Sequence, residues 1–385
     1  MNPNAKTLPL SELATFKSGS TPSKSKTDYW GGDLPWVSAK DLKSPEVVDS
    51  IDRLSETGFA AAKIAPAGSL LILVRGMTLH KDVPVCIAGR DVAFNQDIKA
   101  LIVTEKISPK YLLYFLHSRK NGLLDLVDSA GHGTGRLNTD SLKAFPVLVP
   151  PIPDQTAIAN LLSTWDAAIE KSEKLITAKE KRFLWLQNYL ISHHSTSTSY
   201  KMLRLIDIMT ESRLPDLEGD PEKRITVRLH LKGVEAREYR GTETDGATTF
   251  YKRRSGQFIY GKQNIFKGSL GMVPSKLDGY SSSQDIPAFD IDDSVVSPDW
   301  FYFYISRPSF YKRLEVYAAG SGSKRLHPKE LLKLSIKLPP LPIQNEIAEE
   351  IACYKKEIDL LRTILEAYRK QKRGLMQRLL TGNGV

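Results

Sequence analysis

The stretch Pro150-Pro151-Ile152-Pro153-Asp154-Gln155 returns later in the chain as Pro339-Pro340-Leu341-Pro342-Ile343-Gln344, and each copy opens a long amphipathic run. The same numbering offset relates residues 108–190 to residues 297–379 without a gap. A period this long differs from the 20 to 50 residues of a solenoid repeat. The stretch therefore predicts a duplicated domain, each copy followed by a long helix.

The composition is that of a globular protein with an excess of positive charge. The 385 residues are 41% hydrophobic and 25% charged, and 54 Lys plus Arg against 44 Asp plus Glu give a net charge of +10. Such a charge favours a polyanionic partner, most often nucleic acid, although it also occurs in basic proteins without one. Only Cys86 and Cys353 are present, which argues against a disulfide framework or a cysteine zinc site. We expect a cytoplasmic protein, because no leader or long apolar run is visible.

The chain order predicts four segments. A polar tract over residues 193–199 separates the two halves. Strands are expected at residues 68–74, 83–88 and 98–103, and a helix begins at Pro109. Asn95-Gln96-Asp97-Ile98 has a counterpart in Ser283-Gln284-Asp285-Ile286, but residues 38–93 have no convincing match in the second half. The expected segments are a domain at 1–150, a helix at 151–194, a second domain at 195–338 and a second helix at 339–385.

Both long helices carry an apolar seam. In each helix we select positions that are alternately four and three residues apart, a spacing typical of coiled coils. The set comprises Ile158, Leu162, Trp165, Ile169, Ile176, Phe183, Leu186, Leu190, Ile347, Ile351, Tyr354, Ile358, Leu361, Leu365, Tyr368, Leu375 and Leu379. Ser172, Lys179 and Lys372 interrupt it, either to fix register or as exposed positions.

The length of each helix favours mutual pairing over packing on its own domain, since about 54 Å exceeds a small domain. With the order domain, helix, domain, helix, the pair must be antiparallel and related by a pseudo-two-fold axis. The predicted fold class is α+β, with two mixed α/β domains separated by two long antiparallel coiled-coil-like helices.

With these motifs the chain resembles the specificity subunit of type I restriction–modification systems. The resemblance rests on the two Pro-rich helix starts, residues 10–19 with Trp36-Val37-Ser38, the Asn95-Gln96-Asp97 element and two glycine-rich loops, residues 130–136 and 319–325. Ile343 departs from the acidic residue often found there. The resemblance implies that two target-recognition domains each read half of a split DNA target, while the helices set the spacing and dock two methylation subunits. It also implies double-stranded DNA and restriction subunits that use ATP as partners, and no membrane.

Candidate DNA contacts are basic residues, glycines of the two loops and one tyrosine, because cations bind phosphates and exposed N–H groups bind anions. A solvated face or a flexible glycine connection is the alternative for each. The candidates are Lys17, Lys24, Lys26, Arg75, His80, Lys81, Arg90, Gly133, Arg136, Arg213, Arg228, Arg237, Arg240, Tyr251, Lys252, Arg253, Arg254, Gly322, Lys324 and Arg325.

Two other classes of protein compete with this interpretation. Asp216 followed by Glu222-Lys223 weakly resembles the metal-binding carboxylate pattern of a nuclease, but the composition of residues 214–223 is that of a loop. A coiled-coil interaction scaffold would explain the helices without DNA binding. No phosphate-binding loop, paired-histidine zinc helix or dinucleotide motif is found, so no catalytic residue, metal or cofactor is predicted.

Overall fold

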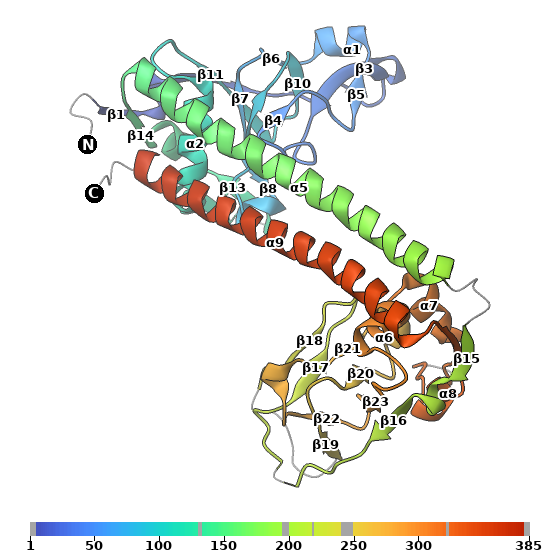
Figure 1. Cartoon of the computed structure of the whole chain (residues 1–385). Helices are drawn as coiled ribbons and strands as arrows, with labels where there is room; N and C mark the ends of the chain where they lie inside the picture. The colour runs from blue at the N-terminus through green and yellow to red at the C-terminus, as the bar shows by residue number, and fades with distance from the viewer. Residues whose placement is uncertain are drawn as a thin grey trace. The chain divides into compact units, whose positions relative to one another are not determined.

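The computed structural model describes residues 5–129, 133–194, 200–217, 219–239, 249–320 and 323–380 (Figure 1). It divides into two compact units, residues 1–173 with 364–385, and residues 174–363. Each unit therefore contains one globular part and portions of both long helices, α5 (Ile152–His194) and α9 (Leu341–Leu380).

The first unit is built on a five-stranded sheet of order β2-β11-β7-β9-β4. Its strands are antiparallel except for β4, which runs parallel to β9. All four side chains of β7 are buried, as expected for a central strand covered on both faces. The strands are β2 (Ala14–Ser18), β4 (Glu46–Val47), β7 (Leu70–Leu73), β9 (Val85–Ala88) and β11 (Ile98–Val103).

The buried side chains of α2 (Pro109–Ser118) belong to the same hydrophobic core as this sheet. Pro109 occupies the first turn of the helix, where a missing N–H costs nothing. A second sheet has the order β5-β3-β10-β6, and beside it α1 (Glu56–Ala61) begins at the N-cap Ser55. Its strands are β3 (Trp30–Val37), β5 (Arg53–Leu54), β6 (Ile64–Ala65) and β10 (Val92–Phe94).

Small elements complete the first unit. A three-stranded sheet of order β12-β13-β8 carries the glycine-rich loop, and β1 pairs with β14. These elements are β1 (Lys6–Pro9), β8 (Arg75–Gly76), β12 (Val127–Ser129), β13 (Gly135–Leu137), β14 (Pro146–Val149), α3 (Lys120–Leu124), α4 (Thr139–Lys143) and the 3-10 turns η1 (Leu10–Glu12), η2 (Thr27–Tyr29) and η3 (Met77–His80).

The second unit has a four-stranded antiparallel sheet of order β16-β23-β20-β21, with an aromatic core. The hairpin β17-β18 and the strand pairs β19-β22 and β15-β24 complete the unit. The strands are β15 (Lys201–Arg204), β16 (Met209–Ser212), β17 (Ile225–Val227), β18 (Val234–Ala236), β19 (Phe250–Lys252), β20 (Phe258–Tyr260), β21 (Leu270–Met272), β22 (Ser281–Ser283), β23 (Ala288–Ile291) and β24 (Ser335–Leu338). The helices are α6 (Pro298–Ile305), α7 (Pro308–Tyr311), α8 (Pro328–Leu332), η5 (Leu205–Asp207), η6 (Ile265–Lys267), η7 (Ser275–Leu277) and η8 (Lys312–Tyr317).

The units share one framework, which extends beyond the repeat visible in sequence. In the order of the chain, α2, α4, β14 and α5 correspond to α6, α8, β24 and α9. Residues 38–93 showed no match in sequence, yet β7 occupies the position of β20. Val74 N donates to Asp97 O (2.8 Å), just as Lys262 N donates to Asp285 O (2.9 Å). Backbone hydrogen bonds keep this strand in place without constraining its side chains.

A buried glutamine joins each long helix to its globular part. Gln155 accepts from Ser108 N (2.8 Å) and donates to Pro150 O (2.8 Å) and Lys106 O (3.1 Å). Gln344 accepts from Ser297 N (2.8 Å) and makes the equivalent donations in the second unit. The Pro-Pro-x-Pro-x-Gln motif is therefore a structural joint. The departure at Ile343 does not alter it, since α9 begins at the position equivalent to the start of α5.

Within each unit the portions of α5 and α9 run antiparallel, which confirms the predicted fold class. In the first unit Trp165 packs edge-on against Tyr368, with ring centroids 5.7 Å apart. In the second, Lys179 pairs with Glu357 (2.6 Å). Every position of the predicted seam is buried or half-buried.

The polar interruptions of the seam have two explanations. Lys372 pairs with Asp166 and, like Lys179, forms an ion pair between the helices. Ser172 instead donates to Ala168 O within α5 (2.7 Å). The two lysines thus bring opposite charges together at defined points of the pairing, whereas the serine is satisfied within its own helix.

Candidate nucleic-acid interface

In the first unit the small sheet β12-β13-β8 brings two of the predicted arginines together. Arg136 in β13 lies directly opposite Arg75 in β8, and both side chains are exposed. Asp128 flanks Arg136 on its other side. Like charges directly opposite each other in a sheet are unfavourable. Within the described part of the chain neither guanidinium has a carboxylate within 4.0 Å, so a phosphate would relieve this repulsion.

The glycine-rich loop of this unit is attached to η3. His80 Nε2 is hydrogen-bonded to Gly133 O (2.7 Å), and Gly133 adopts a left-handed backbone with φ of 73°. A Cβ on Gly135 would lie 2.8 Å from the Cβ of Leu79, so only glycine lets the strand approach this closely. Residues 130–132 lie outside the described residues. The fold thus gathers His80, Gly133, Arg75 and Arg136 at one edge, with Lys81 directly after η3.

The other cations predicted in this unit are exposed but more scattered. Lys17 lies on β2, and Lys24 and Lys26 lie in the Ser-rich loop before η2. Lys26 donates to the hydroxyl of Tyr29 (3.1 Å), and this hydrogen bond raises the pKa of the lysine. Arg90 lies in the turn between β9 and β10, outside the small sheet.

The second unit has a hollow lined by basic and aromatic groups. A space of about 640 Å³ is lined by Arg213, Lys262, Tyr317, His327 and Lys329, with Glu211 and Glu330. A smaller space of about 100 Å³ shares three of these residues and adds Tyr251 and Gln284. Arg213 donates to Glu211 (2.8 Å), which is the carboxylate nearest to it. Lys262 and Lys329 were not predicted, because the hollow assembles them from segments distant in sequence.

The second glycine-rich loop is closed by its own backbone. Ala319 and Arg325 exchange N–H to O hydrogen bonds of 3.0 and 2.8 Å, and Gly320 has φ of 124°. Exposed ion pairs hold the basic end, Arg325 with Asp285 (3.7 Å) and Lys324 with Glu315 (2.9 Å). Such pairs contribute little at a surface, so either cation can exchange its partner for a phosphate. Gly322 lies outside the described residues.

The remaining candidates of the second unit are distributed over the strand pairs β17-β18 and β19-β22 and the segments next to them. Arg228 pairs with Glu235 (2.8 Å), and Arg254 pairs with Asp290 (3.0 Å). Arg237 is exposed, whereas Tyr251 and Lys252 on β19 are half-buried. Arg240 lies outside the described residues.

Arg253 is a correction to the predicted set. Its side chain is 1% exposed and donates to Ser282 Oγ (2.7 Å) and to the carbonyls of Ser212 (2.8 Å) and Ile286 (3.2 Å). Burial lowers the pKa of its guanidinium to about 10. The donors of Arg253 are used to hold β22 and β16 together, so it is a structural residue of the interior rather than a DNA contact.

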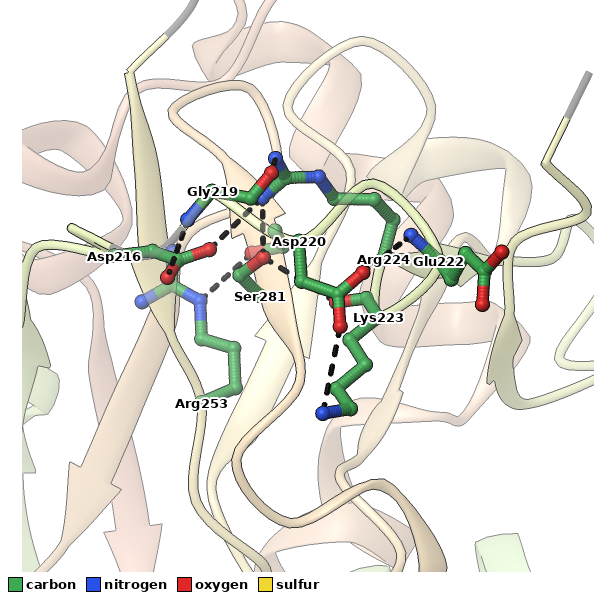
Figure 2. Close-up of polar contacts among 9 residues, drawn as sticks. Asp216, Gly219, Asp220, Glu222, Lys223, Arg224, Arg253 and Ser281 are labelled. Atoms are coloured by element: carbon green, nitrogen blue, oxygen red, sulfur yellow. Dashed lines mark hydrogen bonds and ion pairs between the residues drawn. The ribbon is translucent and has the colours of Figure 1, made fainter. Parts of the chain in front are cut away.

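The acidic stretch considered as a nuclease site has a structural role (Figure 2). Asp216 forms a buried ion pair with Arg224 (2.9 Å), and Arg224 also donates to Ser281 and lies over the ring of Phe250. Burial opposes ionisation of Asp216, but hydrogen bonds from Ser281 and the amide of Gly219, together with Arg224, hold its pKa below the ordinary value. No set of three metal-ligating side chains occurs within the described ranges.

These features define a class of protein: two copies of a mixed α+β framework, each presenting a glycine-rich loop with a basic end, on paired long helices. Among the helices the structure describes, none has the length and apolar character needed to cross a membrane. Duplicated basic surfaces of this kind are typical of proteins that bind a polyanion at two places.

Comparison with known proteins identifies the family. A family model described as the type I restriction modification DNA specificity domain matches residues 3–180 and 255–367, and the chain belongs to this family. The specificity subunit of the type I restriction enzyme EcoR124I/EcoR124II of Escherichia coli is 30% identical over 196 residues, which cover 49% of this chain and 48% of that one. The MjaIX specificity subunit of Methanocaldococcus jannaschii is 24% identical, covering 93% and 90%. The matched part thus spans about half the length of the first relative and most of the second.

Solved structures show the same fold. The type I restriction–modification S subunit from M. genitalium superposes with a TM-score of 0.60 at 15% identity, covering 98% of this chain and 96% of that one. A chain from a study of complex assembly in the type I restriction–modification system gives 0.59 at 12% identity, covering 98% of both. At these identities the likeness concerns the fold alone.

Proposed function

We propose that this chain is the DNA-reading subunit of a type I restriction–modification complex, and that each globular part binds one half of a split duplex target. The observation that carries this proposal is the recurrence of one basic loop in both units. Arg136 and Arg325 occupy equivalent ends of the glycine-rich loops, and the following residues, Leu137 and Leu326, donate to equivalent strand carbonyls (2.9 and 2.8 Å). Two equivalent phosphate-binding edges fit two half-sites better than one continuous site.

The long helices then set the distance between half-sites and bind two methylation subunits. Their ion pairs support a fixed register, since Glu173 pairs with Arg369 (2.6 Å) and Glu180 with Arg362 (2.6 Å). An exposed apolar face supports docking. Trp185 is 60% exposed and stacks on Tyr189 with ring centroids 5.1 Å apart. Apolar and aromatic groups in the open are typical of protein interfaces.

In this proposal the chain itself is not catalytic. Methyl transfer belongs to the methylation subunits, and ATP-dependent cleavage belongs to restriction subunits recruited to the same complex. The proposal includes a cytoplasmic location, because that is where such a complex would meet DNA. Purified chain would then show no metal-dependent cleavage, whereas an autonomous nuclease would cut DNA unaided.

The test is to co-express the chain with its methylation subunit and to map the methylated sequence. A split motif with a fixed spacer is expected, and a continuous motif would contradict the spacing role of the helices. Replacing residues 205–338 by the corresponding domain of another specificity subunit should change one half of the motif and leave the other unaltered. Binding to duplex DNA should also weaken steeply with salt, while an interaction scaffold would show no DNA binding.

A further inference from the structure

Gln96 and Gln284 occupy the same place in the two units. Each lies in a tight turn in which the amide of Ile98 or Ile286 donates to the carbonyl three residues earlier, at 3.3 and 2.9 Å. The residue after each glutamine accepts from the equivalent central strand, as described for Asp97 and Asp285. Both glutamine side chains are exposed, so neither is retained for packing.

In the first unit the turn that carries Gln96 is hydrogen-bonded to two segments that contain candidate phosphate contacts. Thr21 Oγ1 donates to Gln96 Oε1 (2.6 Å), and Thr21 belongs to the Ser-rich loop that carries Lys24 and Lys26. In addition, Arg75 N donates to the carbonyl of Asp97, the neighbour of Gln96 (3.3 Å). The amide of Gln96 is thus held by Thr21, in a turn bonded to two segments that carry candidate cations.

In the second unit Gln284 lines the smaller basic space together with Arg213, Tyr251 and Lys262. Its backbone amide donates to Thr249 O (3.2 Å), which fixes the turn against the strand that carries Tyr251. Asp and Ile follow the glutamine in both units, but the side chains that line this space differ from Thr21, the partner of Gln96. An exposed, neutral amide that recurs at the same backbone position in both units fits a contact to something both half-sites share.

The chemistry of a glutamine amide points to a base. It is neutral and does not neutralise a phosphate, a role already available to the flanking arginines and lysines. Its NH₂ and carbonyl present a donor and an acceptor side by side, which match N7 and the N6 amino group of adenine in the major groove. The carbonyl of Gln96 keeps a second lone pair after accepting from Thr21.

We propose that Gln96 and Gln284 each read one adenine, one in each half of the target, by a bidentate contact. This inference rests on the proposed function and adds the residue and the base that it recognises.

The experiment uses the full chain in complex with its methylation subunit, acting on a plasmid library with randomised duplex inserts. Gln96→Ala should reduce selectivity for adenine by about ten- to hundredfold at one position of one half of the motif. Gln284→Ala should do the same in the other half. Arg136→Gln is the matched comparison, and should weaken binding to all sequences alike while lowering its salt dependence.

If a variant complex methylates too little DNA to give a motif, binding is measured by fluorescence anisotropy. The duplexes carry the wild-type motif or a substitution of adenine in either half. The same loss of selectivity is expected. Unchanged base preference in Gln96→Ala and Gln284→Ala, or a uniform loss of affinity like that of Arg136→Gln, would overturn the inference. A wild-type complex with no split motif would instead overturn the proposed function.

Discussion

The buried glutamine at the start of α9 allows a quantitative test of the joint between helix and globular part. Gln344 is 1% exposed, and replacing it by alanine leaves Ser297 N–H and Pro339 O without their partners. A buried polar group that loses its partner costs about 1–3 kcal/mol, so we expect a loss of about 2–6 kcal/mol for the pair. For a unit of this size a loss near 3 kcal/mol lowers Tm by about 6–12 °C.

Scanning calorimetry would measure this shift. Gln371→Ala is the control, because Gln371 is exposed on the same helix and its loss should change stability by less than about 0.5 kcal/mol. Gln155→Ala should have a smaller effect than Gln344→Ala, since the Ser108 amide that it leaves unpaired is only partly buried. A Tm for Gln344→Ala within about 2 °C of that of the control would refute the structural joint.

The isosteric variant Gln344→Glu adds a pH dependence with a definite sign. Its carboxylate would lie in the interior facing two carbonyl oxygens, which raises its pKa in the folded state above the unfolded value of about 4.3. Below that value the carboxyl is protonated in both states and can still donate one hydrogen bond. The variant should therefore be closest to wild type near pH 4 and lose stability as the pH rises to 7.

Three further outcomes follow from the site. The slope of log affinity against log salt for duplex DNA should be smaller by about 0.9 in Arg136→Gln, as measured by fluorescence anisotropy; an unchanged slope would exclude this arginine from phosphate binding. Wild type should lose stability below about pH 4, because the lowered pKa of Asp216 stabilises the folded state only above the unfolded pKa. In the double variant Asp216→Asn with Arg224→Met this contribution should be absent at every pH, and melting curves at several pH values test it. Lys372→Ala should lower the free energy of unfolding, measured in urea, by about 1 kcal/mol. If a double-mutant cycle with Asp166→Ala gave no coupling energy, the ion pair would not be stabilising.

The framework was predictable because its signals are local. The Pro-rich motifs, the Ser-Pro helix starts and the seam depend on residues close in sequence. The duplication provides a second copy of each of these patterns, which supports the prediction made from the first. The equivalence of β7 and β20 could not be found in this way, since the hydrogen bonds of Val74 and Lys262 are made by backbone atoms. The chain direction and the helix length also predicted the antiparallel pairing.

The candidate interface was less predictable, because exposure of a charged side chain depends on distant partners. Arg253 and Arg254 are adjacent in the sequence, so their sequence neighbours do not distinguish them. Ser282 and two carbonyls from other segments nevertheless hold Arg253 in the interior. Lys329 belongs to the basic hollow only because α8 packs there. Neither outcome can be deduced from the neighbouring residues in sequence.

The division of the units has a consequence for the order of events during synthesis. Leu380 is fully buried in the core of the first unit, together with Leu162 of α5. Leu380 follows Leu162 by more than 200 positions in the chain, so at about 5–20 residues per second it is translated about 10–40 s later. During that interval the apolar face of α5 in the first unit lacks its native cover. Nascent chains of this protein are therefore expected to depend on chaperones until translation reaches the end of α9.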